Sequence, residues 1–169
     1  SYLYLGWAIL QEHVVLAGKD PNANPPEPSV NPNFVNKLGE VVTANYWRDN
    51  PEDALIFDKD MTYQSLDPAA PERTLYRLRE GIERFFITDI NNAAASSLAQ
   101  SAIPVMWDRL TSTLRTIEMT PNGFNHVPGG ANILYMDGHV EFVKYATEHP
   151  VTRAFASAIV QFWQFVNGS

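Results

Sequence analysis

The sequence predicts an α+β fold in which an antiparallel sheet carries a C-terminal β-hairpin and helices pack against the sheet. An apolar run from Ala131 to Met136 and an alternating run from His139 to Tyr145 flank Asp137-Gly138, a dipeptide that is typical of a hairpin turn. After the hairpin, Val151 to Val166 has apolar residues at helical spacing. A length of 169 residues, of which 45% are hydrophobic, fits one globular domain.

The charge and the residue usage exclude several classes of function. The chain has a formal net charge of -7 and no basic run, whereas binding to nucleic acid or to an anionic membrane surface relies on clustered lysine and arginine. It has no cysteine, which rules out disulfides, thiolate metal ligands and a cysteine nucleophile. No apolar run approaches the roughly 20 residues that span a bilayer. No nucleic-acid partner is therefore expected.

The first part of the chain is expected to contain a strand, two helices and a proline-rich loop. Ser1 to Trp7 is aromatic and loosely alternating, which favours a strand, and Ala8 to Ala17 favours a short helix ended by Gly18. The run from Gly18 to Pro32 contains five prolines and is expected to be an internal surface loop. Asn31 then caps a second helix, with Pro32 at its first position. The apolar residues of this helix are Phe34, Val35, Leu38, Val41, Val42 and Tyr46.

The middle of the chain is expected to supply a further helix and two strands. Apolar residues recur at helical intervals from Arg73 to Arg84, although Gly81 argues for an interruption. Phe85 to Ile90 and Ile103 to Trp107 are rich in aromatic and β-branched residues, which favours strands. Pro104 places the second strand at a sheet edge or marks its start. We expect both strands to join the hairpin in one antiparallel sheet.

The hairpin and the last helix have predictable details. Asp137-Gly138 favours a type I′ turn, and the glycines of the preceding entry loop permit a conformation or a close backbone approach that other residues resist. In the second arm, Val140 and Phe142 are expected on the face opposite to Val143 and Tyr145. Thr152 is the expected N-cap of the last helix, and Gly168 follows its end. The apolar stripe of Phe155, Ile159, Phe162 and Val166, widened by Trp163, predicts that this helix is buried against a sheet or a neighbouring subunit.

His126, Asp137 and His139 are the first candidates for a chemical site. A hairpin brings imidazole and carboxylate groups together, which suits metal binding or acid-base chemistry. The alternative is structural: Asp137 forms the turn, His139 lies on the surface and His126 hydrogen-bonds the entry loop. The structural interpretation is favoured because the spacing matches no known ligand signature.

Oxygen ligands for calcium are the second possibility. Asp89, Asn91, Asn92 and Asp108 follow expected strands, and Asp137 is a further weak candidate, but loop capping is the favoured role. The acidic run from Asp49 to Asp60 either attracts a cation or is a solvated loop, and it does not follow the EF-hand pattern. Because these residues form no catalytic set, we expect that the chain is not an enzyme and needs no cofactor. Calcium is the one ion that we consider.

The run HVPGGANILYMDGHVEFV, from His126 to Val143, resembles the C-terminal signature of the prepilin-type processing-associated H-X9-DG proteins, a family of pseudopilin-like envelope proteins. The residues that match the signature are His126, Gly129, Gly130, Ala131, Asn132, Asp137, Gly138 and His139. Ten residues separate His126 from Asp137, one more than in the family, and the additional residue lies in the Val127-Pro128 loop. Leu78 to Asn92, Ser97 to Asp108, the opening SYLYLGWA and the closing HPVTRAF are also similar to family segments.

The resemblance implies the globular domain of a pilin-like or pseudopilin-like protein. Members of the family carry a basic leader, a peptidase cleavage site and a hydrophobic helix that anchors the subunit in the membrane and packs in a filament core. We expect this N-terminal part to be absent from the chain as given. The expected contact with the membrane is made only by that absent part. The implied location is the cell envelope, either at its periplasmic face or in an extracellular filament. The implied partners are further copies of the chain or other pilin-like subunits.

The resulting hypothesis is a structural subunit or accessory protein of a type IV pilus-like or type II secretion-like filament. Two other classes of protein stay open at this point. One is a cell-surface module that binds glycan or peptide through the aromatic N-terminal residues and the proline loop. The other is a metal-dependent hydrolase built on His126, Asp137 and His139.

Overall fold

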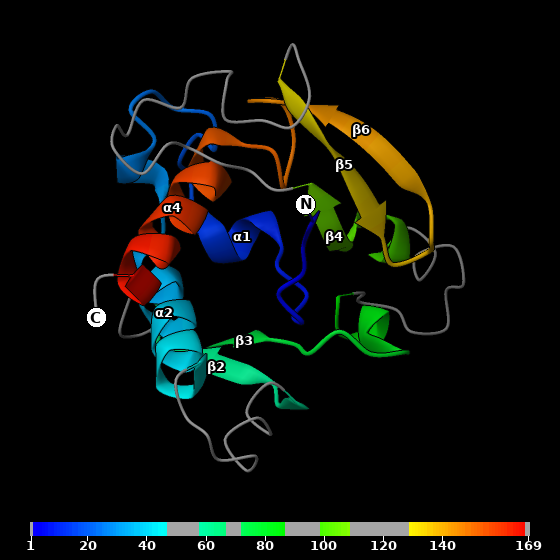
Figure 1. Cartoon of the computed structure of the whole chain (residues 1–169), viewed down its shortest axis with the longest axis horizontal. Coiled ribbons are helices and arrows are strands. Elements are labelled where there is room, and N and C mark those ends of the chain that lie inside the picture. Colours follow the sequence, from blue (N-terminus) through cyan, green and yellow to red (C-terminus); the bar gives the residue numbers. More distant parts are fainter. Residues whose placement is uncertain (1, 47–57, 67–71, 87–98, 109–128, 168–169) are drawn as a thin grey trace.

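The computed structural model describes residues 2–46, 58–66, 72–86, 99–108 and 129–167. The fold combines helices with an antiparallel sheet, which confirms the expected α+β class (Figure 1). The elements, with η for a 3-10 helix, are β1 (Tyr2–Leu3), α1 (Gln11–Val14), η1 (Glu27–Ser29), α2 (Pro32–Tyr46), β2 (Met61–Tyr63), β3 (Arg73–Leu75), η3 (Ile82–Phe85), β4 (Pro104–Asp108), β5 (Gly130–Tyr135), β6 (Val140–Lys144) and α4 (Arg153–Asn167).

The main sheet has the strand order β1-β4-β5-β6, and all its neighbours are antiparallel. The hairpin expected near the C-terminus is β5 with β6, and the strand expected from Ile103 to Trp107 is β4. Pro104 is the first residue of β4, a position that tolerates the missing N–H of proline. The two faces of β6 are also as expected, because Val143 is buried whereas Val140 and Phe142 are exposed.

The hairpin turn differs from the type I′ turn that the sequence predicts. The N–H of Gly138 donates to the carbonyl of Tyr135 at 3.0 Å, and the N–H of Tyr135 donates to the carbonyl of His139 at 3.0 Å. Gly138 has a φ of 91°, but Asp137 is not among the residues with positive φ. A type I′ turn needs positive φ at both central residues, whereas a longer loop that ends in a glycine bulge needs it only at the last. The position of the turn was predicted and its type was wrong.

The helix expected from Arg73 to Arg84 is wrong over most of its length. Arg73–Leu75 is β3, which pairs with β2 in a separate two-stranded ribbon and places Leu75 opposite Met61. Helical backbone occurs only in η3, directly after Gly81, whose φ of 80° provides the expected interruption. Pairing with β2 outweighs helical spacing here, because each side chain of β3 gains a cross-strand neighbour.

Three further predictions, one for a helix and two for strands, differ from the structure. Phe85 ends η3 and Phe86 lies in a bend, so the strand expected from Phe85 does not begin there, and its remaining residues lie outside the described part. The helix expected from Ala8 to Ala17 is reduced to α1, because Val15 forms a β-bridge with Val30. The strand expected at the N-terminus is regular only in β1.

The N-terminal segment contacts both the main sheet and the ribbon. Tyr2 and Leu3 pair with the end of β4. A few residues later, Trp7 forms a β-bridge with Arg77. The pairing continues on both sides of that bridge, since the N–H of Leu78 donates to the carbonyl of Gly6 at 2.9 Å and the N–H of Ala8 donates to the carbonyl of Tyr76 at 2.8 Å. One stretch of chain therefore joins the two β-structures.

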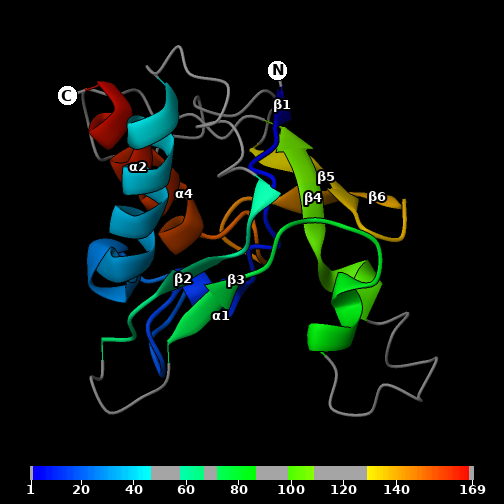
Figure 2. The ribbon, with the colours of Figure 1, turned by 90° about the horizontal axis from the view of Figure 1, so that it is seen from below.

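Helices α2 and α4 pack side by side (Figure 2), and a ring contact joins α4 to the main sheet. The rings of Trp107 in β4 and Phe155 in α4 meet edge to face, with centroids 5.3 Å apart. Both predicted N-caps are confirmed: Asn31 Oδ1 accepts the N–H of Asn33 at 3.2 Å, and Thr152 Oγ1 accepts the N–H of Phe155 at 3.2 Å. The apolar stripe of α4 is buried within the chain itself at Phe155, Ile159 and Phe162.

The cap of α4 leads to a first prediction. Thr152 is fully buried, so Thr152→Val, which keeps the shape and removes the acceptor, leaves the Phe155 N–H without a partner. We expect the free energy of unfolding, measured by urea denaturation, to fall by about 1–2 kcal/mol. Thr152→Ser keeps the hydroxyl and serves as the control. A serine variant that is less stable than the valine variant would contradict the role of the cap.

Candidate functional site

The first polar group of the hairpin consists of Tyr135, Asp137 and His139. The ring of His139 stacks on that of Tyr135, with centroids 4.4 Å apart and an interplanar angle of 10°. Asp137 Oδ1 lies 2.6 Å from His139 Nδ1 and also accepts the backbone N–H of His139 at 3.1 Å. This backbone hydrogen bond, followed by the contact with the imidazole, lowers the pKa of Asp137. The carboxylate and the stacked phenol thus fix the orientation of a half-exposed imidazole.

The same surroundings act on the phenol beneath the imidazole. Burial, followed by the negative charges of Glu141 and Glu148, raises the pKa of Tyr135. The phenol is therefore held in its neutral form under the histidine ring. An Asp-His pair with an oriented imidazole has the parts of a general base, but a catalytic set needs a further group at the reacting atom.

The structure brings together two of the three residues proposed for a metal or acid-base site. Asp137 and His139 are in contact, whereas His126 lies outside the described residues. Within the described ranges, no three histidine, aspartate or glutamate side chains are grouped so that they can hold a metal ion. Asp137 makes hydrogen bonds within its own turn, which is the structural role that the sequence favours.

Asp108, one of the calcium candidates, has a structural role in the main sheet. Its side chain is buried, and Oδ2 accepts both the backbone N–H and the Nδ2–H of Asn132 at 2.9 Å each. Asp108 lies beside the start of β5 and Asp137 follows its end, so these two carboxylates do not share an ion. Asp89, Asn91 and Asn92, which complete the proposed set, lie outside the described residues.

The glycines and the alanine of the motif provide room inside the hairpin. Gly129 precedes β5, and its carbonyl accepts the N–H of Tyr145 at 3.2 Å. A Cβ on Gly130 would lie 2.5 Å from the Phe142 ring and 2.6 Å from the carbonyl oxygen of Val143. Ala131 is fully buried in the core. The close backbone approach expected of these glycines is thus found at Gly130, where the ring of Phe142 covers the backbone.

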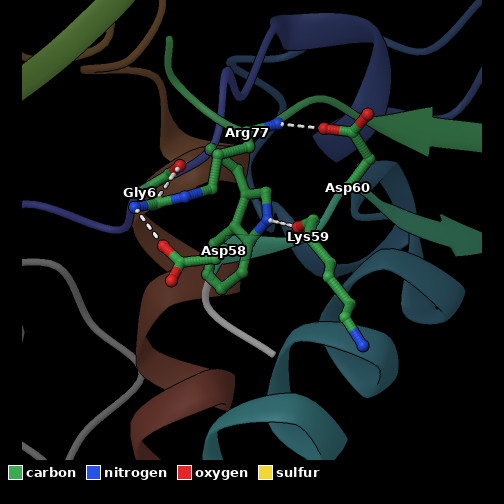
Figure 3. Close-up of polar contacts among 6 residues, drawn as sticks. Gly6, Asp58, Lys59, Asp60 and Arg77 are labelled. Atoms are coloured by element: carbon green, nitrogen blue, oxygen red, sulfur yellow. Dashed lines mark hydrogen bonds and ion pairs between the residues drawn. The ribbon is translucent and has the colours of Figure 1, made fainter. Parts of the chain in front are cut away.

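A second polar cluster lies away from the hairpin, and the sequence did not reveal it (Figure 3). Arg77 donates from Nη2 to Asp58 Oδ1 at 3.0 Å and from Nη1 to the carbonyl of Gly6 at 3.3 Å. Its backbone N–H donates to Asp60 Oδ1 at 2.8 Å, and the other oxygen of Asp60 accepts Arg79 Nη2 at 3.1 Å. The described acidic residues of the run from Asp49 to Asp60 are therefore paired with arginines. The available signal in the sequence is the spacing, because Asp58 and Asp60 lie two residues apart, as do Arg77 and Arg79.

This arginine-aspartate cluster has a structural role. Exposed ion pairs contribute little, typically below about 1 kcal/mol, and Asp58 is largely exposed. The backbone contacts matter more, because they fix the N-terminal segment against the ribbon. Between the two aspartates, the carbonyl of Lys59 accepts the indole N–H of Trp7 at 2.9 Å.

Comparisons with protein-family models, with curated proteins and with solved structures found no match to this chain. Across the part of the chain that the structure describes, no helix has both the length and the apolar character needed to cross a membrane.

The contact between Gly130 and Phe142 leads to a second prediction. Gly130→Ala places a methyl group against the Phe142 ring and the Val143 carbonyl, and we expect it to lower the free energy of unfolding by about 1–3 kcal/mol. In the double variant Gly130→Ala with Phe142→Ala, the ring no longer opposes the methyl group. The loss in the double variant should therefore be smaller than the sum of the two single losses. Additive losses in urea denaturation would show that the ring does not restrict this position.

Proposed function

We propose that this chain is the globular part of a pilin-like or pseudopilin-like protein, acting as a structural subunit or accessory of a type IV pilus-like or type II secretion-like filament. The resemblance of the hairpin to the H-X9-DG signature supports this family. The antiparallel sheet ending in a β5–β6 hairpin agrees with the α+β fold that the family implies. The proposed location is the cell envelope or its exterior, and the proposed partners are other copies of the chain or other pilin-like subunits.

The observation that carries the proposal is an exposed apolar surface on β6, which is the edge strand of the described main sheet. Val140 is 63% exposed and Phe142 is 43% exposed. Charges on an edge strand discourage such contacts, and β6 carries the exposed Glu141 and Lys144, but exposed apolar groups of this kind commonly mark contacts between proteins. We call Val140 and Phe142, with the half-buried Leu134 opposite Val140, the outer hairpin face.

The outer hairpin face suits a contact between subunits better than a catalytic role. Its residues lack nucleophilic or acid-base side chains, and the Asp137-His139 pair lies on the adjoining turn without a third histidine, aspartate or glutamate among the described residues that would complete a metal site. A metal-dependent hydrolase therefore has little support from the geometry. Assembly through a sheet edge needs only apolar surface and backbone pairing.

A surface-binding module is the second candidate, because Tyr2 is 73% exposed and Tyr4 is 50% exposed. Exposed tyrosines are typical of glycan and peptide sites. Phe85 adds little to such a site, since its ring is stacked on Tyr76 at 4.5 Å and covered by Arg84 at 5.2 Å. The Phe85 ring therefore already has two partners within the chain.

The proposed function predicts that Val140→Glu weakens self-association. A buried charge in an apolar contact should raise the dissociation constant at least tenfold, which corresponds to about 1.4 kcal/mol. The variant should keep its fold because Val140 is exposed. Association is measured by sedimentation and crosslinking, and filaments of the protein with its upstream segment are examined by electron microscopy.

Leu66→Glu provides the matched control, since Leu66 is 48% exposed and lies outside the main sheet. Equal association of both variants would remove the outer hairpin face as the contact. If the wild-type protein with its upstream segment stays dispersed as monomers under native conditions, the filament role itself fails, and binding of glycan or peptide at Tyr2 and Tyr4 becomes the function to test.

A further inference from the structure

Two histidines that are far apart in the sequence hold the same stretch of backbone. The Nε2 atom of His149, in the connection between β6 and α4, lies 2.7 Å from the carbonyl oxygen of Ile9. The Nδ1 atom of His13, in α1, lies 3.1 Å from the backbone nitrogen of Leu10 and accepts its N–H. The adjoining residues Ile9 and Leu10 are thus fixed by one imidazole each.

These hydrogen bonds determine which ring nitrogen carries the proton. A carbonyl oxygen only accepts, so Nε2 of His149 must be protonated. A backbone N–H only donates, so Nδ1 of His13 must be unprotonated. Each neutral ring is therefore in the Nε2–H form. The bond at Leu10 is incompatible with a charged His13, because a charged imidazole has no acceptor nitrogen.

A second proton has no favourable place on either ring. His13 is 4% exposed. Part of His149 reaches the surface, but its Nδ1 atom is inaccessible to solvent and has no hydrogen-bond partner among the described residues. The edge of Phe155 faces this ring, with centroids 5.2 Å apart. A proton on Nδ1 of His149 would thus be buried without an acceptor, which is costly.

The charged neighbours add to this cost. His13 is approached by the positive charge of Arg73 in β3, whose guanidinium donates to the carbonyl of Glu12 at 3.4 Å. Tyr63 in β2 contacts the carbonyl of His13 at 3.5 Å, and its phenol is neutral because burial raises its pKa to about 12. Burial, followed by Arg73 and His149, lowers the pKa of His13 to about 4, and burial lowers the pKa of His149 to about 4 as well.

We propose that His13 and His149 form an acid-sensitive clasp on the segment from Ile9 to Val14, so that protonation of the two rings releases α1 while the β5–β6 hairpin stays folded. The hairpin is independent of the clasp because β5 pairs with β6 and with β4, and neither pairing includes the segment from Ile9 to Val14. Helix α1 is only four residues long, and a helix of that length depends on tertiary contacts. The signal is thus a fall in pH, and the part of the fold that responds is the segment from Ile9 to Val14.

The direction of the pH effect follows from the two states. Once the segment is released, each histidine has its ordinary pKa of 6.5, above the value of about 4 in the clasp. The neutral rings therefore favour the clasped state fully above pH 6.5, and this advantage is lost progressively as the pH falls from 6.5 towards 4. At pH 5 the equilibrium constant for opening should be about thirtyfold higher per histidine than at pH 8.

Hydrogen exchange of the whole chain tests the clasp. Between pH 8 and pH 5, the protection factor of the Leu10 amide should fall at least thirtyfold, whereas that of the Tyr135 amide in the hairpin should change less than threefold. An equal fall at both amides would overturn the proposal, because it would indicate global acid unfolding. An unchanged Leu10 amide would overturn it as well.

Substitutions that keep the hydrogen bonds but remove the titration complete the test. His13→Asn retains an acceptor in the place of Nδ1, and His149→Gln retains a donor in the place of Nε2. The double variant should lose the pH dependence at Leu10, while His139→Gln on the exposed turn should keep it. If the double variant retains the acid effect, the clasp is wrong.

If the double variant does not fold, nitrogen NMR of the wild-type histidine rings decides the question. Two rings should show the Nε2–H form and stay neutral at pH 5. Rings in the Nδ1–H form, or titration of both near pH 6.5, would overturn the proposal.

Discussion

The fold depends on the antiparallel pairing between the N-terminal segment and the strand-like chain that follows β3. Trp7 is 1% exposed, forms a β-bridge with Arg77 and donates its indole N–H to Lys59. The same N-terminal segment contains β1, which pairs with β4. One stretch of backbone therefore connects the main sheet to the β2–β3 ribbon. The hydrogen bonds of Arg77 to Gly6, Asp58 and Asp60 fix the direction of this segment. The segment therefore brings Ile9 and Leu10, just before α1, to the positions where His149 and His13 contact them.

The hairpin has a different role, because most of its order is local. Its turn, the Asp137-His139 pair and the ring of Phe142 over Gly130 are contacts within about fifteen residues of chain. One face contributes Ala131 and Val143 to the core, while the other leaves Val140 and Phe142 exposed. A two-stranded hairpin alone is at best marginally stable in water, so the pairing of β5 with β4 and the burial of Ala131 and Val143 hold in place the hairpin that presents this surface. This separation of a buried face from an exposed face supports the proposed role in subunit contacts.

The sequence predicts those elements whose signals are local. The hairpin, α2 and α4 have the expected positions, and Asn31 and Thr152 are the expected caps. The pairing of Trp7 is not predictable in this way, since it joins residues some seventy positions apart. The ribbon is not predictable either, because the helical spacing after Arg73 points to a helix instead of a strand. The sequence also suggests the contact of Asp137 with His139. It does not suggest that Asp108 anchors Asn132 or that Asp58 pairs with Arg77, because both contacts depend on strand order.

The most direct test of this account is native-state hydrogen exchange at pH 7 in increasing urea. The amides of Ala8 and Leu78 form the pairing that joins the two β-structures. If the N-terminal segment holds the fold together, both amides should exchange with the same opening free energy as the most protected amides of β4, through global unfolding. Exchange of Ala8 and Leu78 through a local opening of much lower free energy, with β4 still protected, would contradict it.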